Sequence, residues 1–101
     1  MITINNINEL EQYNDNYIFG GKQYTIPDSC MINFDLLDGE ICLFVSGNLH
    51  SDNNIYVQQI AAKNIMTTKK LIAKDVITAE GCIFAKAKAR RIRARNMRKV
   101  S

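Results

Sequence analysis

Residues that commonly carry catalysis are scarce in this sequence. His50 is the only histidine of the 101 residues. It lies beside Ser51 and Asp52, but neighbours along the chain do not have the geometry of a catalytic triad. The carboxylates at residues 35–40 surround a predicted turn, where solvation accounts for them. We therefore expect His50 to be a surface residue, and we expect a protein that is not an enzyme and binds no metal or cofactor.

Long apolar runs are also absent. No run approaches the roughly 18 to 20 apolar residues that a bilayer-spanning helix needs. The N-terminal Met1-Ile-Thr-Ile-Asn has neither the basic region nor the apolar region of a signal peptide. We therefore expect a cytoplasmic protein of a bacterial host cell that has no membrane contact.

Cysteine is sparse as well. Cys30, Cys42 and Cys82 are an odd number, and no two of them form a Cys-x-x-Cys pair. Each lies among apolar residues at a spacing typical of strands. This favours reduced thiols in a core over disulfides or a zinc site.

A five-residue pattern recurs between residues 60 and 99. Each unit has a large apolar residue, any residue, a small residue and two polar residues, with one extra residue near Thr68 and another near Gly81. A period of five matches neither a helix nor a long strand. The pattern therefore predicts a repeat architecture of stacked strands. The units begin at Ile60, Ile65, Leu71, Val76, Cys82, Ala87, Ile92 and Met97.

The spacing within a unit predicts which residues are buried. In an extended backbone the large and small residues, two apart, point to the same side, and the two polar residues form a corner. We predict a mainly β protein: a short parallel β-helix (solenoid) of about three coils, with hydrogen bonds between coils. Four sides would close a coil of 21 or 22 residues, placing Ile60 over Cys82, Ile65 over Ala87, Leu71 over Ile92 and Val76 over Met97.

The pattern resembles the pentapeptide-repeat proteins and, more loosely, the Ile-Asn-Ala-X-Asp type repeats of bacterial and phage proteins. The resemblance covers the last 42 residues and supplies no catalytic residue. In pentapeptide repeats the small residue comes two before the large one. Here Ala62 and Ala73 come two after Ile60 and Leu71. The inward residues are thus in reversed order, so the coil shape of that family does not carry over.

The N-terminal third is predicted to cap the coils. Asn6 precedes Ile7 and Leu10 with acids nearby, which predicts a short helix over residues 6–13. Gly20-Gly21 lies between two β-rich runs and predicts a hairpin over residues 17–26. We interpret the chain as a single domain, 1–101, with an N-terminal cap of this helix and hairpin (1–37), an irregular first coil (38–59) and repeat coils (60–101).

Charge is distributed very unevenly along the chain. Residues 1–59 hold one cation, Lys22, and eight acids, giving −7, whereas residues 60–101 hold twelve cations and two acids, giving +10. In a stacked fold sequence order is spatial order. An acidic N-terminal end should therefore lie opposite a basic C-terminal end.

Eight cations follow Gly81 without an intervening acid, and they alternate with residues predicted to point inward. Five are arginines, whose planar guanidinium suits phosphate or carboxylate. A merely solubilising basic end is one alternative. An arginine-rich helix over residues 85–99, of the kind that folds on RNA, is another, although the unbroken five-residue spacing favours the coil. The candidate binding residues are Lys86, Lys88, Arg90, Arg91, Arg93, Arg95, Arg98 and Lys99.

These features predict a small non-catalytic binding protein. Its basic coil would dock on nucleic acid, or on the acidic groove of a nucleic-acid-binding protein or ribonucleoprotein. The small size and the resemblance to phage-borne repeats are consistent with a phage-encoded inhibitor of host defence, of the anti-CRISPR kind. The alternative is a structural module that stacks end to end or forms a homodimer through an uncapped C-terminal end.

Overall fold

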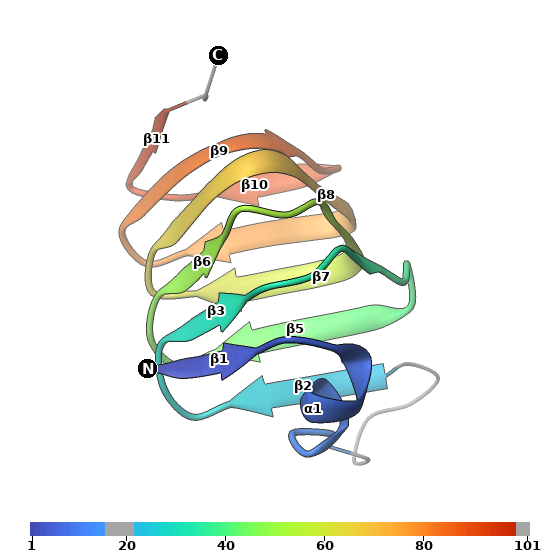
Figure 1. Ribbon diagram of the computed structural model, residues 1–101. Helices are drawn as coiled ribbons and strands as arrows, with labels where there is room; N and C mark the ends of the chain where they lie inside the picture. The colour runs from blue at the N-terminus through green and yellow to red at the C-terminus, as the bar shows by residue number, and fades with distance from the viewer. Residues whose placement is uncertain (16–21, 99–101) are drawn as a thin grey trace.

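A computed structural model describes residues 1–15 and 22–98. The chain forms a parallel β-solenoid of about five turns, with the N-terminus at one end and the C-terminus at the other (Figure 1). This confirms the predicted fold class, although the number of turns exceeds the predicted three. Its elements are β1 (Ile2–Ile4), α1 (Ile7–Glu11), β2 (Lys22–Ile26), β3 (Cys30–Ile32), β4 (Leu36–Leu37), β5 (Ile41–Val45), β6 (Leu49–Ser51), β7 (Ile55–Ala62), β8 (Ile65–Ala79), β9 (Cys82–Lys88), β10 (Arg91–Arg93) and β11 (Asn96–Arg98).

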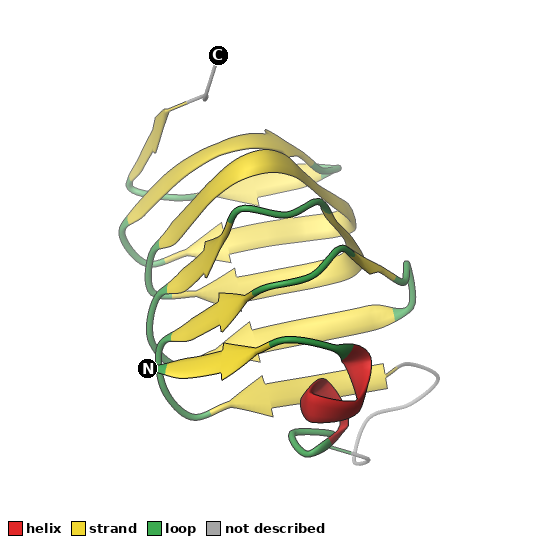
Figure 2. Ribbon diagram, in the orientation of Figure 1, coloured by secondary structure: helices red, strands yellow, loops and turns green. Residues whose placement is uncertain are grey.

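Each turn of the solenoid has three sides, and all the strand pairs along them are parallel. Side A stacks β2, β5, the end of β7, the end of β8 and β10. Side B stacks β1, β3, β6, the start of β8, the start of β9 and β11. Side C stacks β4, the start of β7, the middle of β8 and the end of β9. The long strands therefore bend around corners, as Figure 2 shows.

The predicted four-sided coil is wrong, because three repeat units close a turn. Each unit supplies one side, and the polar residues between units form three corners. Stacked residues are therefore closer in sequence than predicted; Leu49 pairs with Ile65, an offset of 16. The observed partners are Ile77 for Ile60, Ile83 for Ile65, Ala87 for Leu71 and Arg91 for Val76.

The prediction that large and small residues of a unit point inward together is confirmed for the central units. Ile60 and Ala62, like Leu71 and Ala73, are buried. Large side chains on successive turns thus lie over one another and form a continuous apolar core. The same holds for Ile65 and Thr67.

Two later units are displaced by one residue. Val76 is buried in the bend of β8, where the pairing with β7 shifts register, and the inward pair on that side is Ile77 with Ala79. On the next side Ile83 and Ala85 are buried, whereas Cys82 and Phe84, predicted to point inward, are exposed. Each of these two corners contains one residue more than a five-residue repeat would place there.

Burial decreases toward the C-terminal end. Ile92 is half-buried and Met97 is exposed, although both were predicted to be buried. No described strand lies beyond β10 and β11 to cover them. The last turn is therefore the thinnest part of the core.

The N-terminal end is closed by α1 and the segment after it. The Asn6 side chain accepts a hydrogen bond from the Glu9 N–H at 3.0 Å, which starts the predicted helix at the predicted place but for only five residues. The chain then runs along the outer edge of β2, where Asp15 N–H donates to the Gln23 carbonyl at 2.7 Å. Of the predicted hairpin, residues 22–26 form a strand, paired in parallel with β5; residues 17–21 lie outside the described residues.

A polar ladder stabilises the corner between sides A and B. The Asn64 side chain donates to Asn48 Oδ1 at 3.0 Å and accepts from the Cys82 N–H at 2.8 Å. One turn earlier, the Asn48 N–H donates to Ser29 Oγ at 3.0 Å. A Cβ at Gly81 would collide with Asn64 Oδ1, so a larger residue there would displace the Asn64 side chain from this ladder.

The stacked core predicts a large difference between two adjacent residues of β8. Leu71 is fully buried, whereas Ile72 is half-exposed on side C. Leu71→Asp would place a charge without a partner in the core and should lower the free energy of unfolding by about 3 to 5 kcal/mol, or abolish folding. Ile72→Asp should cost about 1 kcal/mol or less. Urea unfolding of both variants checks the register, and equal losses would contradict it.

Removal of two buried hydroxyl groups on side B should change the free energy of unfolding in opposite directions. Ser51 Oγ donates to the Ile32 carbonyl at 2.7 Å, whereas Thr67 Oγ1, one turn later, has no hydrogen-bond partner among the described residues. Thr67→Val should therefore raise the free energy of unfolding by about 1 kcal/mol, and Ser51→Ala should lower it by about 1 to 3 kcal/mol. Thermal unfolding measures both, and a destabilised Thr67→Val variant would show that its hydroxyl is bonded.

Candidate nucleic-acid interface

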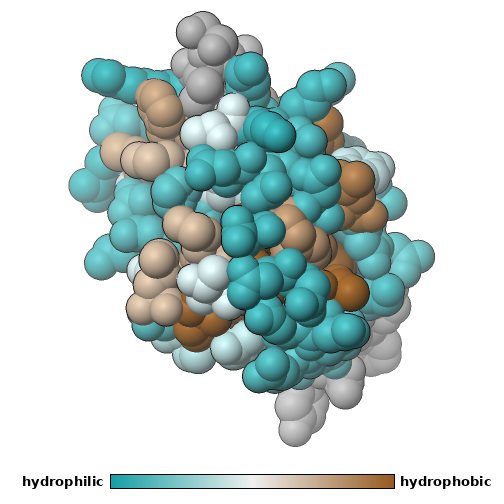
Figure 3. Space-filling model, viewed as in Figure 1, coloured by the Kyte–Doolittle hydropathy of each residue, from teal (hydrophilic) through white to brown (hydrophobic). Residues whose placement is uncertain are grey.

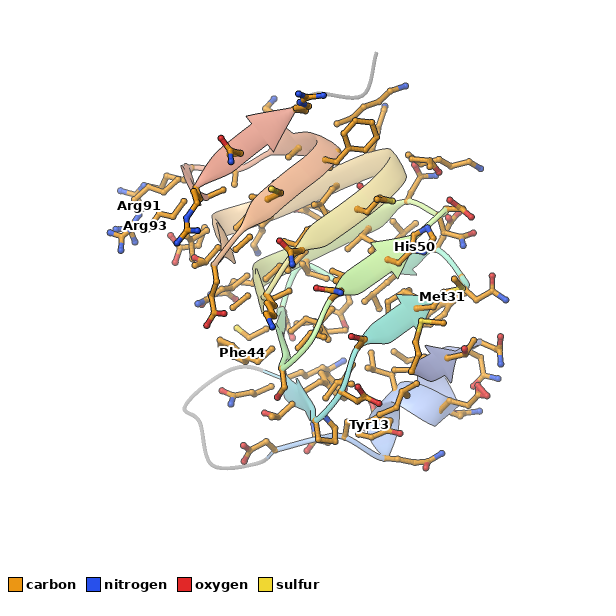
Figure 4. The ribbon with its side chains drawn as sticks, turned by 90° about the vertical axis from the view of Figure 1, so that its left-hand side faces the viewer. Tyr13, Met31, Phe44, His50, Arg91 and Arg93 are labelled. Atoms are coloured by element: carbon orange, nitrogen blue, oxygen red, sulfur yellow. The ribbon has the colours of Figure 1, made fainter. Side chains whose placement is uncertain are left out.

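The cations predicted to form the site lie together on the last turn, which we call the basic terminal coil (residues 86–98). Lys86 and Lys88 are on side C, and Arg98 is on side B. Figure 4 shows Arg91 and Arg93, on side A, projecting together away from the solenoid. Lys99 lies outside the described residues. All seven described cations are exposed: Lys86, Lys88, Arg90, Arg91, Arg93, Arg95 and Arg98.

Alternation along the strands sends these cations outward. Between them lie Ala87, Ala89, Ile92 and Ala94, which are half-buried and pack against the core. Inward and outward residues thus alternate along β9 and along β10, and Arg90 and Arg91 are both exposed where the two meet. The alternative of an arginine-rich helix is wrong, because residues 82–88, 91–93 and 96–98 are strands.

Few carboxylates neutralise this coil. Within residues 1–15 and 22–98 one ion pair reaches it, between Arg91 Nη2 and Asp75 Oδ1 at 3.8 Å. Both side chains are largely in solvent, so the pair contributes little stability. In the acidic N-terminal half, Asp38 forms a shorter ion pair, with Lys22 at 3.0 Å. The Glu40 N–H and Lys22 both lower the pKa of Asp38.

The backbone at this end also has free edges. β10 pairs with β8, and β11 pairs with β9, and no described strand pairs with their other edges. N–H groups of such edges can donate to phosphate or carboxylate oxygens, as can the neighbouring guanidinium groups. The site is therefore a cationic end of the solenoid that offers donors from both side chains and backbone.

The other residues considered for chemistry lie apart from this coil. His50 lies on β6, half-exposed, with its Nε2 3.7 Å from Asp52 Oδ1. Among residues 1–15 and 22–98 no cluster of histidine, cysteine or acidic side chains could hold a metal ion. In the same part of the chain no helix is long and apolar enough to cross a membrane.

The three thiols differ in environment. Cys30 is buried, as predicted, and burial raises the pKa of its thiol to about 12. Cys42 is half-buried, and burial raises its pKa as well. The prediction of a core role is wrong for Cys82, which is exposed because the inward residue of that unit is Ile83.

A second exposed surface, which the sequence pattern does not predict, is a largely apolar row on side B. Met31, His50, Met66 and Phe84 point outward there on successive turns. Phe84 was predicted to be inward, and Met31 shares its strand face with the polar residues Ser29 and Asn33. Their proximity depends on pairing between strands 16 to 19 residues apart. No local signal in the sequence indicates it.

Comparison with protein-family models, with curated proteins and with solved structures finds no match. The parallel β-helix of short repeats agrees with the architecture that the resemblance to pentapeptide-repeat proteins implies, and no family match identifies the chain as one of them.

The thiols predict an order of chemical modification. At pH 8 a thiol with a pKa of about 12 is a thiolate in roughly one part in ten thousand, so Cys30 should resist iodoacetamide in the folded protein. Cys82, exposed to solvent, should react first, and Cys42 more slowly. Peptide mass spectrometry over time measures the order. Rapid labelling of Cys30 without unfolding would contradict its burial.

Proposed function

We propose that the basic terminal coil binds the phosphate backbone of nucleic acid. The observation that carries this proposal is the concentration of seven exposed cations, five of them arginines, on one turn. Only one has a carboxylate partner within residues 1–15 and 22–98. A surface that only keeps the protein in solution does not need its cations gathered on one turn, and lysine would suit such a surface as well as arginine does.

The geometry of the coil suits a phosphate backbone. Two residues apart on one strand, Arg91 and Arg93 point the same way, with Cα atoms about 6.6 Å apart by strand geometry. Lys86 and Lys88 do the same on side C, and Arg90 lies at the corner between the two sides. The cations thus follow a bent path around the solenoid, which can contact several successive phosphates.

The same surface has little means of reading bases. After Phe84 the sequence contains no aromatic residue, and Phe84 itself lies on side B. Stacking on aromatic side chains, the usual way to hold single-stranded bases, is therefore absent from sides A and C of the coil. Binding through phosphates alone carries little sequence preference.

A structural module remains the second candidate, because β10 and β11 have free edges. Stacking end to end would require a free edge at the other end. There the chain after α1 already covers part of β2, through Asp15 N–H to Gln23 and Thr25 N–H to Tyr13. This favours recognition of another molecule over filament formation.

Reversal of two arginines tests the proposal. Arg91→Glu with Arg93→Glu should weaken binding to mixed-sequence DNA and RNA steeply at low salt. Each lost phosphate contact should also reduce the slope of log affinity against log salt by about one. Fluorescence anisotropy over a salt series measures both. The matched control is Lys63→Glu with Lys69→Glu, which makes the same change in charge at exposed residues outside the last turn and should keep the slope.

Two other outcomes have distinct meanings. If the parent protein binds no nucleic acid but captures a nucleic-acid-handling protein from nuclease-treated lysate, and the arginine reversal abolishes capture, the coil recognises an acidic groove. An inhibitor of a defence complex would behave in this way. If the reversed protein keeps every partner of the parent, the coil is only a solvated surface.

A further inference from the structure

Side B presents a row of outward side chains that runs the length of the solenoid. The row runs from Thr3 through Met31, His50, Met66 and Phe84 to Arg98, and these residues are paired in register on successive strands. Met66 is 52% exposed and Phe84 is 40% exposed. Figure 4 shows His50 above Met31 on the edge of the molecule opposite Arg91 and Arg93. Large apolar side chains are thus left in solvent along one side of a small protein.

A second row beside it is polar but carries no charge. It consists of Ser29, Asn48, Asn64, Cys82 and Asn96, at the start of the same strands. Two adjoining hollows open on side B, with volumes of about 560 and 460 Å³, and both are lined by Met66, Cys82 and Phe84. Figure 3 shows apolar surface on the side of the molecule where β3, β6 and β11 lie in Figure 1.

The two ends of side B have opposite charge. Asp35 flanks the first turns, where Asp28 is paired with the N-terminal amine at 3.3 Å. Arg95 and Arg98 flank the last turn. A partner suited to this side is therefore apolar along its middle, basic where the first turns lie and acidic where the last turn lies. A second copy of this chain, turned end for end, has that distribution.

We infer that side B is the interface of an antiparallel homodimer, with a two-fold axis that passes between β6 and the start of β8. Such an axis places each row against the same row of the second copy, running in the opposite direction. Met31 then faces Phe84 of the second copy, and His50 faces Met66 of the second copy. In the polar row Asn48 faces Asn64 of the second copy, where amide groups can exchange hydrogen bonds. Met31 thus meets the ring of Phe84, Met66 meets the imidazole ring of His50, and the polar residues of the second row meet polar ones.

The size of the side is sufficient for a stable dimer. The molecule measures 33 × 25 × 21 Å, so one full side has an area close to the roughly 800 Å² per partner of standard interfaces. Exposed methionine and phenylalanine, with few charges at the centre, also match the composition of interface cores. A parallel arrangement would bring the two basic ends together, and charge therefore selects the antiparallel one.

Dimerisation through side B would cover Arg98, which pairs in register with Phe84, but it leaves sides A and C of the proposed nucleic-acid surface accessible. Arg91 and Arg93 lie on side A, and Lys86 and Lys88 lie on side C. The inference does not depend on the proposed function, because the dimer forms without a ligand. If both hold, the dimer presents one basic coil at each end.

The experiment measures mass against protein concentration under reducing conditions, by light scattering and sedimentation equilibrium. The parent should approach twice the 11.5 kDa monomer mass. Met66→Glu and, separately, Phe84→Glu should weaken dimerisation at least about tenfold. The matched control is Tyr56→Glu, which places the same charge at a 38% exposed aromatic residue on side C and should leave the dimer unchanged. Circular dichroism verifies that each variant is folded.

Salt and crosslinking test the antiparallel arrangement. Because opposite ends attract, raising sodium chloride from about 50 to about 500 mM should weaken the dimer. A dimer formed through the repelling basic ends would instead strengthen. In a Ser29→Cys variant, the new cysteine would lie opposite Cys82 of the second copy. A short bismaleimide should therefore join these two residues, and peptide mass spectrometry identifies the crosslink. A parent that stays monomeric, a dimer insensitive to both glutamate variants, or a dimer that strengthens with salt would each overturn the inference.

Discussion

Parallel hydrogen bonding between successive turns is the constraint on which the rest of this structure depends. A narrow solenoid has no room to satisfy its peptide groups within one turn, so each strand must pair with the turns before and after it. Parallel pairing holds Cα atoms of successive turns about 4.8 Å apart. Side chains therefore lie in rows, and each row repeats one environment. The side chain of Leu71, for example, is buried because Ile55 packs on it from the preceding turn and Ala87 from the following turn.

The same constraint creates the surfaces. Outward residues also lie in rows, so a composition that changes slowly along the sequence becomes a gradient along the solenoid. Acids near the beginning and cations near the end thus become opposite charged ends. The uncharged residues of β3, β6, β8 and β9 become a continuous neutral side between them. Recognition of a polyanion by sides A and C of the last turn and association through side B use different rows, and for that reason they are compatible in one small molecule.

The ends of a solenoid are where this regularity stops. At the beginning, α1 occupies the place of a strand, and the chain after it covers β2. At the end, β10 and β11 keep one free edge each among the described residues, and the alanine-rich inward rows leave a thin core under Ile92. Mutual repulsion of the cations on that turn disfavours edge pairing with another copy. A charged edge of this kind is one of the devices that keep open sheets from aggregating.

The sequence by itself determined what depends on residues close together in the chain. The two-residue spacing of Ile60 and Ala62 places both inside any extended unit, and the alternation after Gly81 places the cations outside; both predictions hold in the structure. The charge asymmetry likewise needs only the order of residues. Only the tertiary structure decided how many units close a turn, because the angle at each corner depends on how three sides pack around one core. That angle sets the register, and the register decides that Leu71 lies under Ala87 rather than Ile92 and that Phe84 joins Met66 on the surface. The candidate basic coil could be predicted for this reason, whereas the row on side B could not.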